Sequence, residues 1–390
     1  MGVVRRVPPA AVVMALVFAC LAVAAWVAGH GIGVDSAVYR AGALTLLHGD
    51  SLYSPLTTGE SWAPALPFTY PPIAAVLFLP LAALPSQLGW GLLAVLSALG
   101  LGLVLRESLP ERYRGAWPIG ALLTATLLLE PIWRSIGLGQ VNVILMTMVA
   151  ADVLLLRGRK GAGLLIGTAA AIKLTPLIFV GHLVLTRRWA DAARALAAFA
   201  CLNLVAALLL PGDTGRFWTE ALFDGNDAAT NSWIGNQSLN GIFQRLTGEG
   251  RAALVLYGVS ALVLLAAAAW LTHRLHRAGD DLGALLVSAF AGLLVSPVSW
   301  THHWVWIVPL AGYLIAHARW WALAALVAVF TGWQFPIVPS GAKSELRWTL
   351  GDGLLGNAYV LAGFAAAVVI AILAVRGRTG RAEVGAGLPG

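Results

Sequence analysis

The chain has 390 residues, of which 59% are hydrophobic and only 11% are charged. Soluble domains carry about 25% charged residues, so a soluble fold of this composition would lack a polar surface, and lipid must surround most of the chain. The net charge of +7 does not indicate nucleic-acid binding, because the basic residues cluster at the ends of apolar runs, as in helical membrane proteins. The composition therefore predicts an all-α polytopic membrane protein.

About twelve apolar stretches are candidates for membrane spans, which need about 20 residues each. They are apolar all round, without period-two alternation, which excludes a transmembrane β-barrel. The first follows Arg5 and Arg6 and is expected to be a span rather than a cleaved signal peptide, because no small-x-small site leads into a soluble domain. The candidates are 9–29, 71–84, 87–106, 116–131, 139–157, 162–187, 189–211, 252–274, 281–299, 303–318, 320–336 and 353–375.

The stretch 162–187 does not fit a simple alternation of spans, because basic residues flank both of its ends. Within it, Lys173 is followed closely by Pro176. A proline-broken helix is tolerated in a membrane only where its freed backbone faces protein or a wet cavity. We therefore expect a broken or re-entrant hairpin here, which leaves the span count open by one or two.

The basic clusters also predict the orientation of the chain. By the positive-inside rule both termini lie in the cytoplasm, and the longer polar stretches 30–70, 212–251 and 337–352 lie outside. We expect one transmembrane domain over 1–378 in the plasma membrane. A disordered cytoplasmic tail rich in Gly and Arg is expected over 379–390.

Charged residues beside apolar runs are site candidates, because a charge costs about 2.5–3.5 kcal/mol on insertion scales. Asp35 stands just past the outer end of the first span, where a carboxylate can act as a general base or bind a cation. Its alternative role is a helix N-cap. Lys173 is the most isolated cation, and its partner is either a phosphate or a carboxylate such as Glu130.

Uncharged polar residues mark two further places. Tyr70 stands at a proline-rich helix start, where it is either part of a site or an aromatic of the membrane interface. Gln140 and Asn142 stand at a helix start between two apolar runs. Their amides can cap a helix, join helices or bind sugar hydroxyls.

Polar side chains of the outer segments suit carbohydrate. The amides of Asn236, Gln237 and Asn240 stand close together near a tryptophan, and amides form paired hydrogen bonds with hydroxyl groups. The adjacent His302 and His303 join two apolar runs. Phosphate binding or proton handling suits them better than a metal, since neighbours in sequence rarely ligate one ion together and no third ligand is evident. Packing at the interface is their alternative.

Other chemistry is absent from the sequence. The cysteines, Cys20 and Cys201, lie inside apolar runs and indicate neither a disulfide framework nor a metal site. There is no Walker loop, no dinucleotide-binding glycine motif and no nucleophile elbow.

Taken together, these motifs resemble the polyprenol-phosphate-mannose-dependent α-(1→2)-mannosyltransferases of actinobacteria, in the GT-C superfamily (glycosyltransferase family 87). The segments that carry the resemblance span most of the chain in the order of the family. They are Asp35 with Tyr39 and Gly42, Leu66–Pro80, Gly139–Asn142, Ile172–Pro176, Asn236–Gly241 and Ser296–Trp304.

The resemblance implies a GT-C-like bundle of about twelve transmembrane helices that needs no metal or other cofactor. It implies an inverting transfer of mannose from polyprenyl phosphate mannose to a glycolipid on the outer leaflet. Asp35 would be the general base, while His302 or His303 would meet the donor phosphate or orient the acceptor. The substrate-binding residues it implies are Tyr39, Tyr70, Arg134, Gln140, Asn142, Lys173, Asn236, Gln237, Asn240 and Trp300.

Three alternatives stay open at this point. The match around Leu66–Pro80 favours a phosphatidylinositol mannoside as acceptor, but the motifs do not specify the acceptor or the linkage. A related enzyme class would use decaprenyl phosphate arabinose as donor. A protein of another class, a lipid-linked sugar transporter or flippase, would move its substrate without forming a glycosidic bond.

Overall fold

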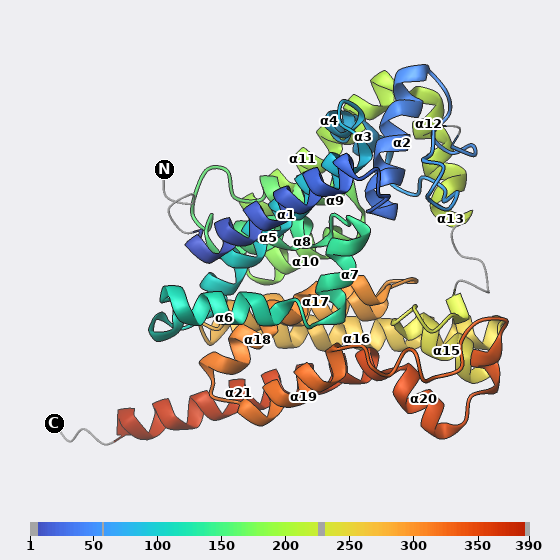
Figure 1. Ribbon diagram of the computed structural model, residues 1–390. Helices are drawn as coiled ribbons and strands as arrows, with labels where there is room; N and C mark the ends of the chain where they lie inside the picture. The colour runs from blue at the N-terminus through green and yellow to red at the C-terminus, as the bar shows by residue number, and fades with distance from the viewer. Residues whose placement is uncertain (1–6, 57, 225–230, 387–390) are drawn as a thin grey trace.

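The computed structural model describes residues 7–56, 58–224 and 231–386, and their regular elements are helices (Figure 1). An isolated bridge between Asn236 and Trp300 is the one β-type pairing in these ranges. The all-α expectation is therefore confirmed.

The N-terminal half builds one layer of the molecule, in which α1 packs along α5 and α9 packs along α8 and α11 (Figure 1). Its helices are α1 (Pro9–Val27), α2 (Val34–His48), α3 (Pro72–Leu77), α4 (Leu79–Ala82), α5 (Ser86–Ser108), η2 (Glu111–Tyr113), α6 (Ala116–Thr126), α7 (Glu130–Leu138), α8 (Asn142–Leu154), α9 (Leu164–Ile172), η3 (Thr175–Leu177), α10 (Ile178–Leu185), α11 (Trp189–Leu209), α12 (Pro211–Arg216), η4 (Phe217–Ala221) and α13 (Leu222–Asp224).

The C-terminal half forms the second layer, which meets the first where α10 contacts α17 and α18 contacts α5. Its helices are α15 (Leu239–Thr247), α16 (Arg251–Arg277), α17 (Asp281–Val295), η5 (Thr301–Trp306), α18 (Ile307–Ala316), α19 (Trp320–Phe330), η6 (Ser344–Arg347), α20 (Leu350–Gly356) and α21 (Ala358–Ala386). Helix α21 thus extends into the range predicted to be a disordered tail, and 387–390 lie outside the described residues.

Helix boundaries follow local sequence chemistry. Pro9, Pro72 and Pro131 stand in the first turns of α1, α3 and α7, where a missing N–H leaves no hydrogen bond unmade. Gly49 and Gly139 follow the last turns of α2 and α7 with φ of 77° and 71°, a conformation that glycine adopts without a Cβ clash. The proline-rich helix start expected beside Tyr70 is therefore confirmed, since α3 begins at Pro72.

The count of about twelve spans is not confirmed. In the described part of the chain, four helices are long and apolar enough to cross a membrane: α1, α5, α11 and α16. The count rises to six if two bent pairs, α6 with α7 and α20 with α21, each make one span. Four further apolar helical segments are shorter, and of these α17 is almost wholly buried in protein. Hydropathy marks segments that avoid water, but it does not separate lipid-facing from protein-facing ones, and breaks such as Pro176 shorten the helices.

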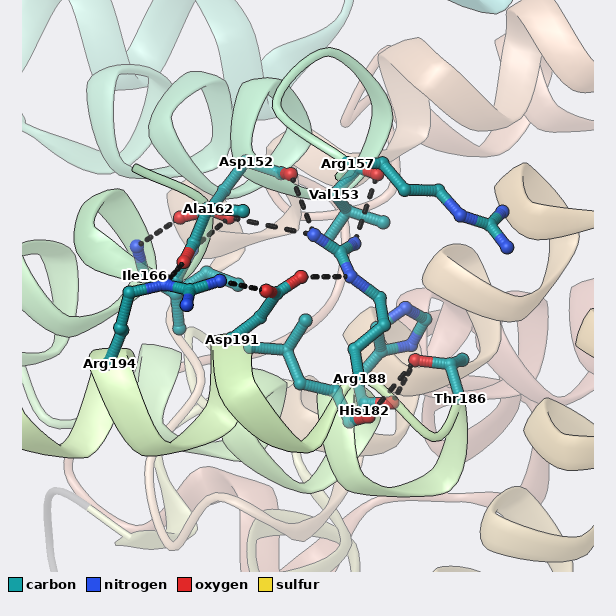
Figure 2. A network of polar contacts seen from close by, with 12 residues as sticks. Asp152, Val153, Arg157, Ala162, Ile166, His182, Thr186, Arg188, Asp191 and Arg194 are labelled. Atoms are coloured by element: carbon teal, nitrogen blue, oxygen red, sulfur yellow. Dashed lines mark hydrogen bonds and ion pairs between the residues drawn. The ribbon is translucent and has the colours of Figure 1, made fainter. Parts of the chain in front are cut away.

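The expected hairpin over 162–187 is confirmed. Helix α9 ends at Ile172, Lys173 has extended φ and ψ of −149° and 131°, and α10 returns. Its two ends meet the same residue: the Gly163 N–H donates to Asp152 Oδ1 at 2.6 Å, and Arg188 Nη2 lies 3.9 Å from that oxygen (Figure 2). The two ends of the hairpin thus lie together beside Asp152, near the end of α8, while Lys173 at the bend donates to Asn142 at the start of α8.

Candidate active site

Asp35 stands in the first turn of α2. The N-cap is Gly33, whose φ is 80°, and it forms no side-chain cap. The Ser36 hydroxyl instead donates to the Gly33 carbonyl at 2.8 Å. The alternative role of Asp35 as an N-cap is therefore wrong, because its carboxylate turns away from the helix backbone and meets another element.

That element is the turn between α7 and α8. Gln140 Nε2 donates to Asp35 Oδ2 at 2.6 Å, and Gln140 Oε1 accepts a hydrogen bond from Tyr39 at 2.8 Å. Tyr70 lies beside Tyr39, with their hydroxyl oxygens 2.8 Å apart. The structure thus brings together four residues from three separate segments of the chain, three of them named above as substrate-binding.

Asp35 is half-buried, and burial is the largest influence on its acidity. Burial raises the pKa of Asp35, while the hydrogen bond from Gln140 and the positive charges of Lys173 and Arg134 lower it. The net direction is upward from the ordinary value of 3.8. A carboxylate with a raised pKa accepts a proton more readily, as a general base requires.

Lys173 lies at the bend of the hairpin and faces the same region. Its Nζ donates to Asn142 Oδ1 at 3.0 Å, stands 3.1 Å from His303 Nε2, and lies 5.7 Å from the centre of the Tyr70 ring. Glu130 is not its partner, since the Glu130 carboxylate contacts Thr301, Tyr359 and Arg134. Among the ion pairs of the described residues, none includes Lys173 or Asp35.

The two histidines have different environments. The His302 carbonyl accepts hydrogen bonds from Ser135 at 2.8 Å and Asn142 at 3.0 Å, which fixes the backbone beside Lys173. His302 Nε2 is buried without a hydrogen-bond partner among the described residues, whereas His303 Nε2 meets Lys173. Burial, and then the charges of Lys173 and Arg134, hold the pKa of His302 well below 6.5, so its imidazole is neutral at pH 7.

A cavity of about 60 Å³ opens beside Lys173 and His303. Its polar end also includes Asn142 and Ser299, and the rest of its wall is mostly apolar. The remaining lining residues are Leu145, Met146, Val149, Thr175, Pro176, Ile178, Phe179, Ala289, Gly292, Leu293, Val305 and Trp306. A cationic end and an apolar wall suit a phosphate that carries a hydrocarbon chain.

The outer-loop amides use their hydrogen bonds within the protein. Asn236 Nδ2 and Asn240 Nδ2 each donate to the Pro297 carbonyl at 3.1 Å, and Asn236 Oδ1 accepts from the Ser299 N–H at 3.0 Å. Gln237 Nε2 donates to backbone carbonyls at 2.7 and 2.6 Å. These buried amides fix the segment that leads to Trp300 and the histidines.

Comparisons with known proteins agree on one family. The model of glycosyltransferase family 87 matches residues 68–297. A polyprenol-phosphate-mannose-dependent alpha-(1-2)-phosphatidylinositol mannoside mannosyltransferase of Mycobacterium tuberculosis is 33% identical over 374 residues, covering 88% of this chain and 86% of the relative. The chain belongs to glycosyltransferase family 87.

A second protein similar to this chain is a polyprenol-phosphate-mannose-dependent alpha-(1-2)-phosphatidylinositol pentamannoside mannosyltransferase of Mycolicibacterium smegmatis. It is 35% identical over 331 residues, covering 82% of this chain and 79% of the relative. Among solved structures, ArnT from Cupriavidus metallidurans bound to undecaprenyl phosphate aligns over 92% of this chain and 77% of its own, with a TM-score of 0.41 and 15% identity. Membership in family 87 makes the protein a membrane-bound glycosyltransferase.

Sequence reasoning missed several residues that build this family 87 site. Ser135 holds the His302 carbonyl, and Thr301 donates to Glu130 Oε1 at 2.7 Å, with Tyr359 at 3.1 Å from the other oxygen. Ser135 lies between two apolar runs and Tyr359 lies inside one, and neither has a distinguishing spacing. Glu130 was considered only as a partner of Lys173; its position beside an apolar run is the signal that marks it, but that signal does not reveal the partners of its buried carboxylate.

Proposed function

We propose that this enzyme transfers mannose from polyprenyl phosphate mannose to a phosphatidylinositol mannoside, forming an α-(1→2) linkage with inversion. The substrates are those named in similar proteins that are 33–37% identical to it. The observation that carries the mechanism is an oriented carboxylate, Asp35, near an ammonium group, Lys173, neither in an ion pair among the described residues.

In this mechanism Asp35 removes the proton from the acceptor hydroxyl as its oxygen attacks C1 of mannose. The bond between C1 and the phosphate oxygen breaks, and its electron pair leaves on the polyprenyl phosphate. Lys173 and His303 bind that phosphate and stabilise its growing negative charge. His302, neutral and with a free Nε2, hydrogen-bonds a substrate oxygen.

The cavity beside Lys173 supports the placing of the donor. Its apolar wall, including Met146, Phe179 and Trp306, suits the first isoprene units of the lipid. The overall architecture is proposed to be that of the GT-C superfamily, with a single transmembrane domain over 1–378.

The distribution of charge supports an extracytoplasmic site. Arg157 pairs with Asp281, and His276 Nδ1 lies 2.6 Å from the same carboxylate, so the ends of α8, α16 and α17 meet there. Arg188 lies at that end of α8 as well, whereas Asn142 and Lys173 lie at the other end. The positive-inside rule assigns the basic end to the cytoplasm of a plasma-membrane protein.

The test is a transfer assay with purified protein in lipid nanodiscs. Radiolabelled polyprenyl phosphate mannose and decaprenyl phosphate arabinose are offered separately, with a phosphatidylinositol mannoside as acceptor. We expect a mannosylated product that a linkage-specific α-(1→2)-mannosidase digests. Transfer of arabinose alone would show that the donor is decaprenyl phosphate arabinose and would overturn the assignment of mannose. Movement of lipid-linked sugar without a new glycosidic bond would overturn the proposal that the protein is a transferase.

A further inference from the structure

A chain of hydrogen bonds leads from two tyrosines to Asp35. The hydroxyl oxygens of Tyr70 and Tyr39 are 2.8 Å apart, and Tyr39 donates to Gln140 Oε1 at 2.8 Å. The amide nitrogen of Gln140 then donates to Asp35 Oδ2 at 2.6 Å. Gln140 is therefore held at both ends of its amide.

The chemistry of these groups fixes the direction of each bond. A carboxylate only accepts, so Gln140 must present its NH2 group to Asp35 and its oxygen to the tyrosines. Tyr39 has one hydroxyl proton, which it gives to Gln140, so it accepts a hydrogen bond from Tyr70. Chains of hydrogen bonds with one direction strengthen one another in a buried setting.

Packing leaves the amide little freedom. Tyr39 is 1% exposed and Gln140 is 7% exposed, and the Tyr39 ring stacks on Phe78 with centroids 4.6 Å apart. Gly139 has a φ of 71°, and a Cβ at that position would lie 2.5 Å from Ser36 Oγ. This close approach of the α7–α8 turn to α2 places the amide against the carboxylate.

We infer that Gln140 is a positioning residue that orients the general base, and that it does not bind sugar. The inference rests on the function proposed above. Gln140 holds Oδ2 of Asp35, so that Oδ1, which accepts no hydrogen bond from the described residues, faces the acceptor hydroxyl. Tyr39 and Tyr70 act through Gln140 and likewise do not touch substrate.

The decisive variant is Gln140→Leu, which keeps the side chain's approximate size and removes the hydrogen bond. Without that bond Asp35 is a weaker acid and takes up a proton at a higher pH. The decline of kcat/KM toward low pH, the acid limb of the profile, therefore begins at a higher pH than in the wild type. Since hydrogen bonds to charged groups contribute about 1.5–3 kcal/mol, the acid limb should rise by roughly 1 to 2 pH units. Lys173, Arg134 and the two tyrosines also face Asp35, and this variant leaves them in place.

Two tyrosine variants provide a graded series. Tyr39→Phe removes the 2.8 Å bond to the Gln140 oxygen, whereas Tyr70→Phe removes the hydroxyl that lies 3.4 Å from it. The acid limb should therefore shift most for Gln140→Leu, less for Tyr39→Phe and least for Tyr70→Phe. The matched control is Gln87→Leu, because Gln87 donates to a backbone carbonyl, that of His30, and its loss should leave the profile unchanged.

The outcomes separate this inference from the proposed function. An unchanged acid limb in Gln140→Leu, with a raised KM for the acceptor, would show that the amide binds sugar and would overturn the inference. If gel filtration shows that Gln140→Leu is misfolded, Tyr39→Phe and Tyr70→Phe provide the test. An unchanged acid limb in both of these variants would also overturn the inference. Absence of mannosyl transfer by the wild type at every pH would instead overturn the proposed function.

Discussion

The two ends of α8 carry two clusters of buried polar groups that are built in opposite ways. At its start, the site cluster contains Asp35, Gln140, Asn142, Lys173 and His303, joined mainly by neutral partners. At its other end, the anchoring cluster pairs carboxylates with guanidinium groups. It consists of Asp152, Arg188, Asp191 and Arg194 (Figure 2).

In the anchoring cluster each charge has several partners. Asp152 accepts from the N–H groups of Gly163, Leu165 and Ile166 at 2.6, 3.0 and 3.1 Å, at the start of α9. Arg188 donates to Asp191 at 2.6 Å and to the Val153 carbonyl at 3.1 Å. Such a cluster has little capacity left for a ligand.

In the site cluster the charges keep capacity for a ligand. Lys173 has three N–H donors, and the structure pairs it with the neutral groups of Asn142 and His303. Asp35 accepts one hydrogen bond from the described residues. A buried charge with unused hydrogen-bonding capacity favours a substrate that supplies the missing partner, whereas a saturated one favours a structural role.

The largest effect on chemistry is expected for Asp35→Asn. Loss of a general base costs roughly 10³-fold in kcat. Burial raises the pKa of Asp35, so at pH 7 the ionised group costs folding stability, and the neutral amide removes that cost. Transfer should therefore collapse while the melting temperature stays equal or rises.

The control for Asp35→Asn is Glu111→Gln, an exposed carboxylate in η2. It should retain wild-type transfer. A fully active Asp35→Asn variant would contradict the distinction between the two clusters as well as the mechanism.

The opposite result is expected for Asp152→Ala. It leaves three backbone N–H groups and Arg188 without their carboxylate, and breaking such a buried set costs about 3–5 kcal/mol. The measurement is thermal unfolding in nanodiscs. The kcat of the protein that remains folded should fall far less than it does for Asp35→Asn.

Asp280→Ala is the matched control for that loss of stability. Asp280 caps α17 through one backbone N–H, that of Gly283, at 2.8 Å, and it accepts from Tyr313 at 2.7 Å. Removing the cap and the hydrogen bond from Tyr313 costs about 1 kcal/mol each, which is less in total than the loss expected for Asp152→Ala. Equal destabilisation by the two variants would show that the anchoring cluster is no stronger than an ordinary cap.

Lys173→Met tests the unused capacity of the site cluster. It keeps an unbranched side chain and removes the charge that would meet the leaving phosphate, so kcat should fall roughly 10²-fold. Stability should change little, because its present partners are neutral. Lys160→Met, an exposed site in the turn after α8, is the control. A large loss of stability with a normal kcat would show that Lys173 stabilises the fold and does not act on the leaving phosphate.

The sequence contains isolated charges that belong to both clusters, but only the site cluster was predicted from it. The rule that isolated charges in apolar runs mark sites selected Asp35 and Lys173, and the structure brings both into the site cluster, where the charge of Lys173 lowers the pKa of Asp35. The same rule applies to Asp152, in the apolar run of α8, and would have identified it as an isolated charge. It would not have shown that Asp152 is saturated, since its partners are backbone groups that sequence does not reveal.

The outer-loop amides show a second limit of prediction from sequence. Density of Asn and Gln predicted sugar binding at Asn236 and Gln237, but their side chains are fully buried and bind backbone carbonyls. A loop without regular structure leaves backbone groups to be satisfied by side chains. Sequence composition cannot separate an amide that serves a loop from one that serves a ligand, because both require the same donors and acceptors.

The smallest effect is expected for Arg194→Ala, at the edge of the anchoring cluster. Its side chain is 34% exposed, it pairs with Asp191 and it donates to the Ala162 carbonyl at 2.7 Å. Because Asp191 keeps its bond to Arg188, the loss should be about 0.2–1 kcal/mol, measured again by thermal unfolding, with transfer unchanged. A loss as large as that of Asp152→Ala would mean that the cluster acts as one cooperative unit, in which every charge depends on every other.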